Sequence, residues 1–154
     1  MTKRDLIHEC WDDFCRLQPQ KDNGYTAEAF GDSPEMADRL GQLIAAGIKT
    51  ATASCYPLYA LDGEALPKEG DYTIILDGKD RPLCITETLK VTVIPFDQVS
   101  ARHAYLEGEG DRSLSYWRRV HQEFFANELD DAGILFDPAV QVVCEEFRVV
   151  FRPT

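Results

Sequence analysis

The chain changes its hydrophobic pattern at Gly47, and this change limits the fold more than any other feature. Before it, residues 6–17 and 36–44 repeat apolar side chains at helical spacing. After it, strand-like segments dominate, at 49–54, 72–76, 83–94 and 140–151. Further helical regions begin near residue 96 and run from about 113 to 129. Helices followed mostly by strands predict an α+β fold built on a small mixed barrel or curled sheet.

Local signals mark the ends of the two early helices. Thr2 and Asp5 form the pattern of a capping box, and Pro19 is expected to end the first helix. Ser33–Pro34 is a strong helix start, with proline in the first turn. Gly47 is a good left-handed stop for the second helix.

Length and charge limit the class of function. A chain of 154 residues suits one domain with one core. Acids outnumber bases 27 to 16, for a formal net charge of -11. This argues against a protein that coats duplex DNA, which needs broad basic faces to displace counterions. A nucleoside or a short single strand needs only a few local cations and a stacking surface, so such ligands stay open.

The cysteines and the N-terminus indicate a cytoplasmic protein with reduced thiols. No CxxC occurs, and the opening MTKRDLIHEC has no apolar signal-peptide core. The sequence has no long apolar run, so we predict no contact with a membrane. The cysteines are too scattered to predict a zinc site. They are Cys10, Cys15, Cys55, Cys84 and Cys144.

A single lysine, Lys49, follows Gly47 at the head of a run of small residues and hydroxyls. In a regular strand Thr50, Thr52 and Ser54 share one face and Lys49 lies on the other. A bulge or bend would be required to bring Lys49 and Thr52 together. A lysine in a cleft can hold a phosphate or carbonyl oxygen. The alternative is a solvated lysine that the helix dipole favours after a helix end.

Acidic residues separated by glycines form a second feature, EGEGD at 107–111. Glu107, Glu109 and Asp111 can bind a hard divalent cation such as Mn²⁺ or Mg²⁺ through their oxygens. They can also cap the helix that starts near Ser113, where negative charge is favourable.

Aromatic residues supply surfaces on which a base can stack. Trp117 and His121 lie one helical turn apart, and they form either an exposed stacking pair or part of the core. Tyr59, Tyr105 and Tyr116 are further tyrosines that could stack a base. The predicted ligand-contacting residues are Thr50, Ser54, Tyr56, Trp117 and His121.

Glu87 lies in the middle of the strand pattern LCITETLKVTVI, where acids are disfavoured. If it faces a cleft it needs a cationic partner, of which Lys49 is the obvious type. If it faces solvent it carries no functional meaning.

Five segments together resemble the ASCH domain family over about residues 30–152. They are GIKTATAS, GDYTIIL, CITETLKVTVIPF, EGEGDRSLSYWRRVHQEFF and VVCEEFRVVF. The resemblance implies one domain over 1–154 with a PUA-like fold, a small mixed β-barrel with flanking helices and a cleft beside it. Residues 1–29 are similar to the N-terminal helical extension of longer bacterial members.

The resemblance also implies a role with RNA. Some members of the family are ribonucleases on single strands. A shorter bacterial branch removes the acyl group from N4-acylated cytidine with a lysine, a threonine and a glutamate. These carry over to Lys49, Thr52 and Glu87, although EGEGD and the tryptophan helix place the chain nearer the longer members.

Three functional interpretations follow. In the first, the protein binds or cleaves short single-stranded RNA or nucleotides, with Lys49 on the phosphate and an optional metal at EGEGD. In the second, Thr52 attacks an amide, Lys49 takes its proton and Glu87 donates or positions one. In the third, the cleft binds a nucleotide without chemistry.

Overall fold

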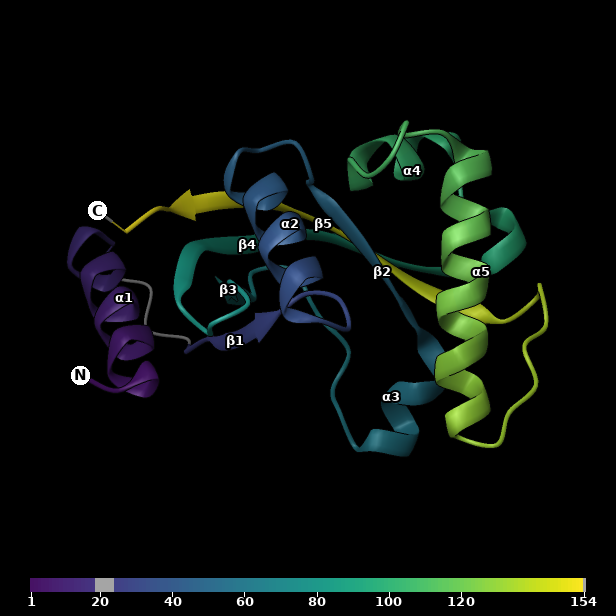
Figure 1. Cartoon of the computed structure of the whole chain (residues 1–154), viewed down its shortest axis with the longest axis horizontal. Helices are drawn as coiled ribbons and strands as arrows, with labels where there is room; N and C mark the ends of the chain where they lie inside the picture. The colour runs from purple at the N-terminus through teal and green to yellow at the C-terminus, as the bar shows by residue number, and fades with distance from the viewer. Residues whose placement is uncertain (19–23, 154) are drawn as a thin grey trace. The chain divides into compact units, whose positions relative to one another are not determined.

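The computed structural model describes residues 1–18 and 24–153 of the chain (Figure 1). Helices and a mixed sheet make up its fold, which confirms the predicted α+β class. In chain order the elements are α1 (Lys3–Leu17), β1 (Thr26–Ala29), α2 (Pro34–Ala45), β2 (Ala51–Cys55), α3 (Tyr56–Asp62), β3 (Tyr72–Leu76), β4 (Pro82–Pro95), the 3-10 turn η1 (Phe96–Gln98), α4 (Ala101–Glu107), α5 (Leu114–Asp131) and β5 (Gln141–Phe151).

The strands described join in one sheet with the order β1-β3-β4-β5-β2. β1 runs parallel to β3, with Thr26 opposite Thr73, whereas β3 pairs antiparallel with β4. β2 and β5 also pair antiparallel, which places Ala51 opposite Glu146. One parallel pair among antiparallel pairs makes the sheet mixed, as the sequence predicts.

The chain divides into two compact units. The first unit comprises Met1–Ile48, Glu69–Leu89 and Phe147–Thr154, and the second comprises Lys49–Lys68 and Lys90–Glu146. The long strands β4 and β5 contribute residues to both units. Lys49, Glu107, Glu109, Trp117 and His121 all belong to the second unit.

The core of the first unit forms around β3, which is buried on both faces. Alternate side chains of a strand point to opposite faces. Tyr72, Ile74 and Leu76 therefore pack with α1, whereas Ile75 packs with Ile44 of α2. Burying each large apolar side chain stabilises the fold by about 1.5–3 kcal/mol.

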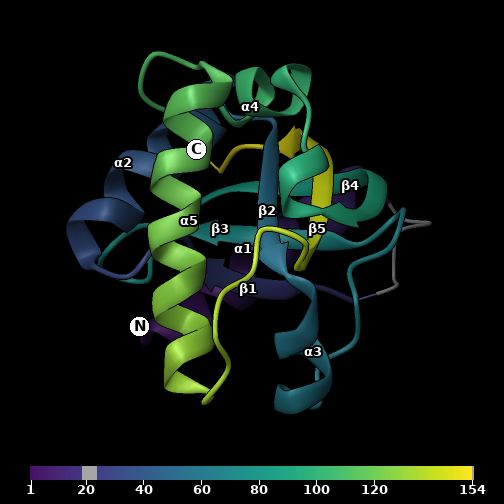
Figure 2. The ribbon, with the colours of Figure 1, turned by 90° about the vertical axis from the view of Figure 1, so that its right-hand side faces the viewer.

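The core of the second unit lies between α5 and the β2–β5 pair. Figure 2 shows α5 alongside these strands, with α4 beside its N-terminal end. The buried residues of α5 recur at helical spacing and so form one apolar stripe, and this stripe faces the strands. The buried residues of this core are Cys55, Phe96, Val99, Ala104, Trp117, Phe125, Leu129, Val142 and Cys144.

The predicted helix signals agree with the structure where it describes them. Thr2 and Asp5 form the capping box of α1 in both directions, and the Ser33 side chain caps α2. Gly47 has a left-handed φ of 76° and follows Ala46, the C-cap of α2. Pro19, the expected end of the first helix, lies outside the described residues. The sequence did not predict β1 or α3, and the helical region expected near residue 96 is two elements, η1 and α4.

The cysteines behave as structural thiols. No disulfide joins those described, and all except Cys15 are buried. Burial raises the pKa of Cys84 and of Cys144 to about 12, so both stay protonated at neutral pH. No helix among residues 1–18 and 24–153 combines the length and the apolar character that crossing a membrane requires.

Candidate functional site

Lys49 lies between the end of α2 and the start of β2, and the neighbouring backbone fixes its place. The amide and the hydroxyl of Thr50 both donate to the carbonyl of Leu106 in α4, at 2.8 and 3.3 Å. This contact joins the approach to β2 with the C-terminal turn of α4. The Lys49 side chain consequently lies beside the EGEGD segment, within the second unit.

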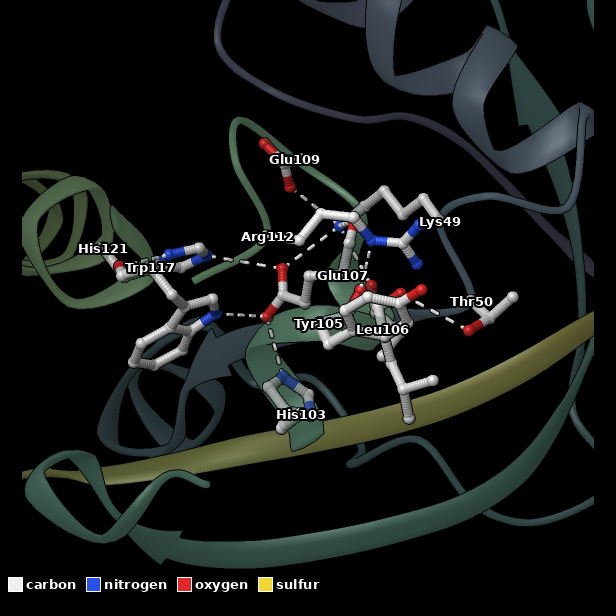
Figure 3. Close-up of polar contacts among 11 residues, drawn as sticks. Lys49, Thr50, His103, Tyr105, Leu106, Glu107, Glu109, Arg112, Trp117 and His121 are labelled. Atoms are coloured by element: carbon white, nitrogen blue, oxygen red, sulfur yellow. Dashed lines mark hydrogen bonds and ion pairs between the residues drawn. The ribbon is translucent and has the colours of Figure 1, made fainter. Parts of the chain in front are cut away.

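The Lys49 ammonium is buried and has several acceptors (Figure 3). It donates to the Ala51 carbonyl at 2.9 Å, to Glu107 Oε1 at 3.1 Å and to Glu109 Oε2 at 2.9 Å. The Glu107 carbonyl lies 3.4 Å away. Only 2% of the side chain is exposed, so Lys49 is not the solvated lysine of the alternative interpretation. A cation at this depth requires such partners, because an unpaired buried charge is strongly unfavourable.

The Glu107 carboxylate is the hub of this network. Its Oε2 accepts from His103 Nε2 at 2.7 Å and from Trp117 Nε1 at 2.6 Å. His121 Nε2 lies 3.4 Å from Oε1, the oxygen that also meets Lys49. His103 precedes Glu107 by one turn of α4, and Trp117 and His121 lie one turn apart on α5. Two helices therefore converge on one buried carboxylate.

His121 lies between two hydrogen-bond acceptors. Its Nδ1 lies 2.9 Å from the Trp117 carbonyl, which can only accept a hydrogen bond, so Nδ1 carries a proton. Its Nε2 faces the Glu107 carboxylate, which likewise only accepts. The His121 ring therefore donates to the Trp117 carbonyl and lies next to the Glu107 carboxylate.

The charges keep Lys49 and Glu107 ionised in spite of burial. Burial by itself lowers the pKa of Lys49, but the charges of Glu107 and Glu109 outweigh it and raise that pKa. Burial by itself raises the pKa of Glu107, yet Lys49 and the hydrogen bonds from His103 and His121 hold it well below its usual range. Lys49 is therefore an ammonium ion at neutral pH.

These opposite shifts predict how stability depends on pH. The lowered pKa of Glu107 adds stability above its unfolded value of about 4.3, which is lost as the pH falls through the folded pKa. The raised pKa of Lys49 adds stability below about 10.4, which is lost as the pH rises through the folded value. We expect the free energy of unfolding, measured with urea, to fall less between about pH 7 and about pH 3 in Glu107→Gln than in wild type. An equal fall in the two proteins would contradict this.

The predicted metal ligands do not come together as a metal site. Glu107 and Glu109 both contact Lys49, whereas Asp111 Oδ1 accepts from the amide of Ser113 at 2.9 Å, before α5. Within the described part of the chain, no group of three or more histidines, cysteines or acids is arranged to hold a metal ion. The predicted cap of α5 is also not an EGEGD acid: the Ser113 hydroxyl caps the helix by accepting from the Tyr116 amide, and Asp111 holds the Ser113 backbone.

The hydroxyls of β2 are not brought to Lys49. Thr52 is half-buried opposite Glu145 of β5, and no hydrogen bond among the described residues links it with Lys49. The Ser54 hydroxyl lies 2.7 Å from the Tyr59 hydroxyl. Tyr56 is exposed at the start of α3.

Trp117 belongs to the core. Its ring stacks on Phe96, with centroids 5.4 Å apart, and on His121, with centroids 4.3 Å apart. Only 2% of Trp117 is exposed, so it offers no face on which a base could stack. Its role is to hold Glu107 through the indole N–H.

Glu87 is paired, but not with Lys49. Its Oε1 accepts from Arg148 Nη2 at 3.0 Å and Nε at 3.3 Å, within the first unit. The pair lines a pocket of about 460 Å³ in that unit, together with Phe14, Gln18, Tyr72, Val149 and Val150. Glu87 thus has a cationic partner, but it is Arg148, and the acids that pair with Lys49 are Glu107 and Glu109.

Sequence reasoning missed two features of the candidate site. One is His103, whose spacing of four from Glu107 was a usable signal, because such a pair meets on one helix face. The other is a rim of cations on tyrosines around the 108–113 loop. The Arg112 guanidinium lies 3.7 Å from the centre of the Tyr105 ring, and that of Arg119 lies 5.4 Å from the Tyr116 ring.

Comparisons with known proteins agree with this architecture. A crystal structure of a protein from Enterococcus faecalis V583 is 39% identical and superimposes with a TM-score of 0.89, covering 96% of this chain and 90% of that one. A crystal structure of an ASCH domain from Lactobacillus crispatus JV V101 is 30% identical, with a TM-score of 0.88, covering 97% and 94%. None of the curated sequences compared with the chain matches it. The profile of the ASCH domain matches residues 26–151, which include β1. The chain belongs to the ASCH domain family.

Proposed function

We propose that this protein binds short single-stranded RNA or nucleotides, with an anionic oxygen of the ligand at Lys49. The ASCH family is associated with RNA, which supports the ligand class. The observation that carries the proposal is the Lys49 ammonium, kept charged at low exposure by a network prepared around it. An ammonium held in place in this way can donate a charge-assisted hydrogen bond to a phosphate oxygen.

The rim of the 108–113 loop, formed by the pairs Tyr105–Arg112 and Tyr116–Arg119, supplies the further contacts that a single strand needs. Tyr105 is 55% exposed on α4, under the Arg112 guanidinium. Tyr116 and the exposed Arg119 repeat the combination on α5. Tyrosine rings can stack bases and arginines can contact phosphates, a combination that binds single strands with little sequence preference.

The net charge of -11 limits the kind of RNA that can bind. The acidic surface repels a long polyanion, whereas a short strand engages only the local cations. We therefore propose a ligand of a few nucleotides, and we expect duplex DNA to bind more weakly.

Binding of a fluorescent single-stranded RNA of about six nucleotides, followed by anisotropy, tests the proposal. We expect affinity to fall as salt rises from about 50 to about 200 mM. The double variant Lys49→Met/Glu107→Gln removes both charges without leaving a buried ion, and it should weaken binding about 10- to 100-fold. Unchanged affinity in the folded double variant would overturn the proposal.

The same geometry bears on the two enzymatic interpretations. Amidohydrolysis needs Lys49 to accept a proton from Thr52, but the Lys49 ammonium is charged and no hydrogen bond joins the two. A ribonuclease needs a cation that stays charged on the phosphate, which agrees with the state of Lys49. Assays on single-stranded RNA, with and without Mn²⁺ or Mg²⁺, and on N4-acetylcytidine separate cleavage, deacylation and simple binding.

A further inference from the structure

The two carboxylates on Lys49 differ in how firmly they are held. Glu107 is 2% exposed and has hydrogen bonds from His103 and Trp117 as well as Lys49. The Glu109 side chain is 17% exposed, and Lys49 is the one side-chain partner that the described residues give its carboxylate. Glu107 is therefore a fixed part of the site, whereas Glu109 can be replaced at the cost of a single contact.

Glu109 comes to Lys49 from a loop and not from a helix. It lies between Gly108 and Gly110, whose φ values of 73° and 58° are left-handed. A Cβ at Gly110 would lie 2.4 Å from the Tyr116 ring, so only glycine lets the loop close against α5. In the view of Figure 3, Glu109 approaches the ammonium from above and Glu107 from below. The loop thus places on Lys49 the more exposed of its two carboxylate partners.

We propose that the Glu109 carboxylate occupies the place on Lys49 that a ligand phosphate takes, and that binding exchanges one for the other. This inference rests on the proposed function. A phosphodiester group carries one negative charge, as a carboxylate does, so the exchange leaves the charge balance around Lys49 unchanged. A neutral nucleoside would displace Glu109 without replacing its charge. The ligand class is therefore a nucleotide or an RNA phosphate, and not a free nucleoside.

The exchange has a measurable effect on affinity. A ligand that binds only the open form has its apparent affinity reduced by the fraction of molecules in that form. If Glu109 covers Lys49 in about nine molecules of ten, removing its charge should strengthen phosphate binding about tenfold. The effect should be larger for a nucleoside monophosphate than for the corresponding nucleoside.

The experiment compares Glu109→Gln with Glu123→Gln, which makes the same change in net charge at an exposed position of α5. The probe is the fluorescent six-nucleotide RNA, with uridine monophosphate and uridine as competitors. We expect Glu109→Gln to bind RNA about tenfold more tightly than wild type, Glu123→Gln to stay within about twofold, and only the monophosphate to compete well.

The failures of the two proposals are distinguishable. If Glu109→Gln binds as wild type does, or more weakly, while Lys49→Met/Glu107→Gln loses binding, the exchange is overturned and the proposed function stands. If Glu123→Gln strengthens binding as much as Glu109→Gln, the gain is a net-charge effect and the exchange is also overturned. If the double variant at Lys49 and Glu107 binds as wild type does, both proposals fail. Circular dichroism of each variant confirms that it is folded.

Discussion

Replacing Lys49 by methionine is expected to lower the free energy of unfolding by about 3–5 kcal/mol. Methionine fills a similar volume, but it leaves the Glu107 carboxylate buried without its cation. Removing one partner of a buried pair costs more than the pair contributes, because the remaining charge is neither solvated nor paired. Glu109 is better placed to turn towards water, so Glu107 dominates the cost.

Urea unfolding of four proteins measures this effect as a double-mutant cycle: wild type, Lys49→Met, Glu107→Gln and the double variant. We expect Glu107→Gln alone to cost about 1–3 kcal/mol, because Lys49 keeps Glu109. The double variant should lose less stability than the two single variants lose in sum. We expect this difference, the coupling energy, to be about 0.5–3 kcal/mol. Additive losses would mean that Lys49 and Glu107 do not depend on each other.

Replacing Trp117 by alanine is expected to lower the free energy of unfolding by about 3–5 kcal/mol. The indole is buried between the Phe96 and His121 rings and donates to Glu107. Trp117→Phe keeps an aromatic ring but removes the N–H donor, and it should cost about 1–3 kcal/mol.

The second tryptophan provides a matched control. Trp11 is also buried in a core, that of the first unit, and its indole N–H has no hydrogen-bond partner among residues 1–18 and 24–153. We expect Trp11→Phe to cost less than Trp117→Phe in the same unfolding experiment. Equal costs would show that the hydrogen bond to Glu107 contributes nothing measurable.

Strong local signals made much of the fold predictable. Capping at Thr2 and Ser33 and the apolar periodicity fix α1 and α2, and β3 has the predicted range of 72–76. β1 was missed because it is a short, exposed edge strand whose stability comes from pairing with β3, which no local pattern reveals. α3 was missed because its start has no side-chain cap and it buries no residue.

The sequence predicted the cation of the site, Lys49, but not the acids that pair with it. Lys49 stood out as the single lysine in a run of small residues, and it lies where two acids converge. Glu107 was expected as a metal ligand, because an ion pair between residues 58 positions apart leaves no trace in local spacing. For the same reason the sequence did not predict Arg148, the cation that pairs with Glu87 in the structure.

Photocrosslinking tests most directly the central claim that RNA binds at Lys49. A short RNA that carries 4-thiouridine is bound to the wild-type protein, and the complex is irradiated. The modified peptides are then identified by mass spectrometry. Binding at Lys49 predicts crosslinks around Tyr105 and Tyr116, on the rim of the 108–113 loop. Crosslinks confined to the first unit, around the pocket at Glu87 and Arg148, would contradict the claim.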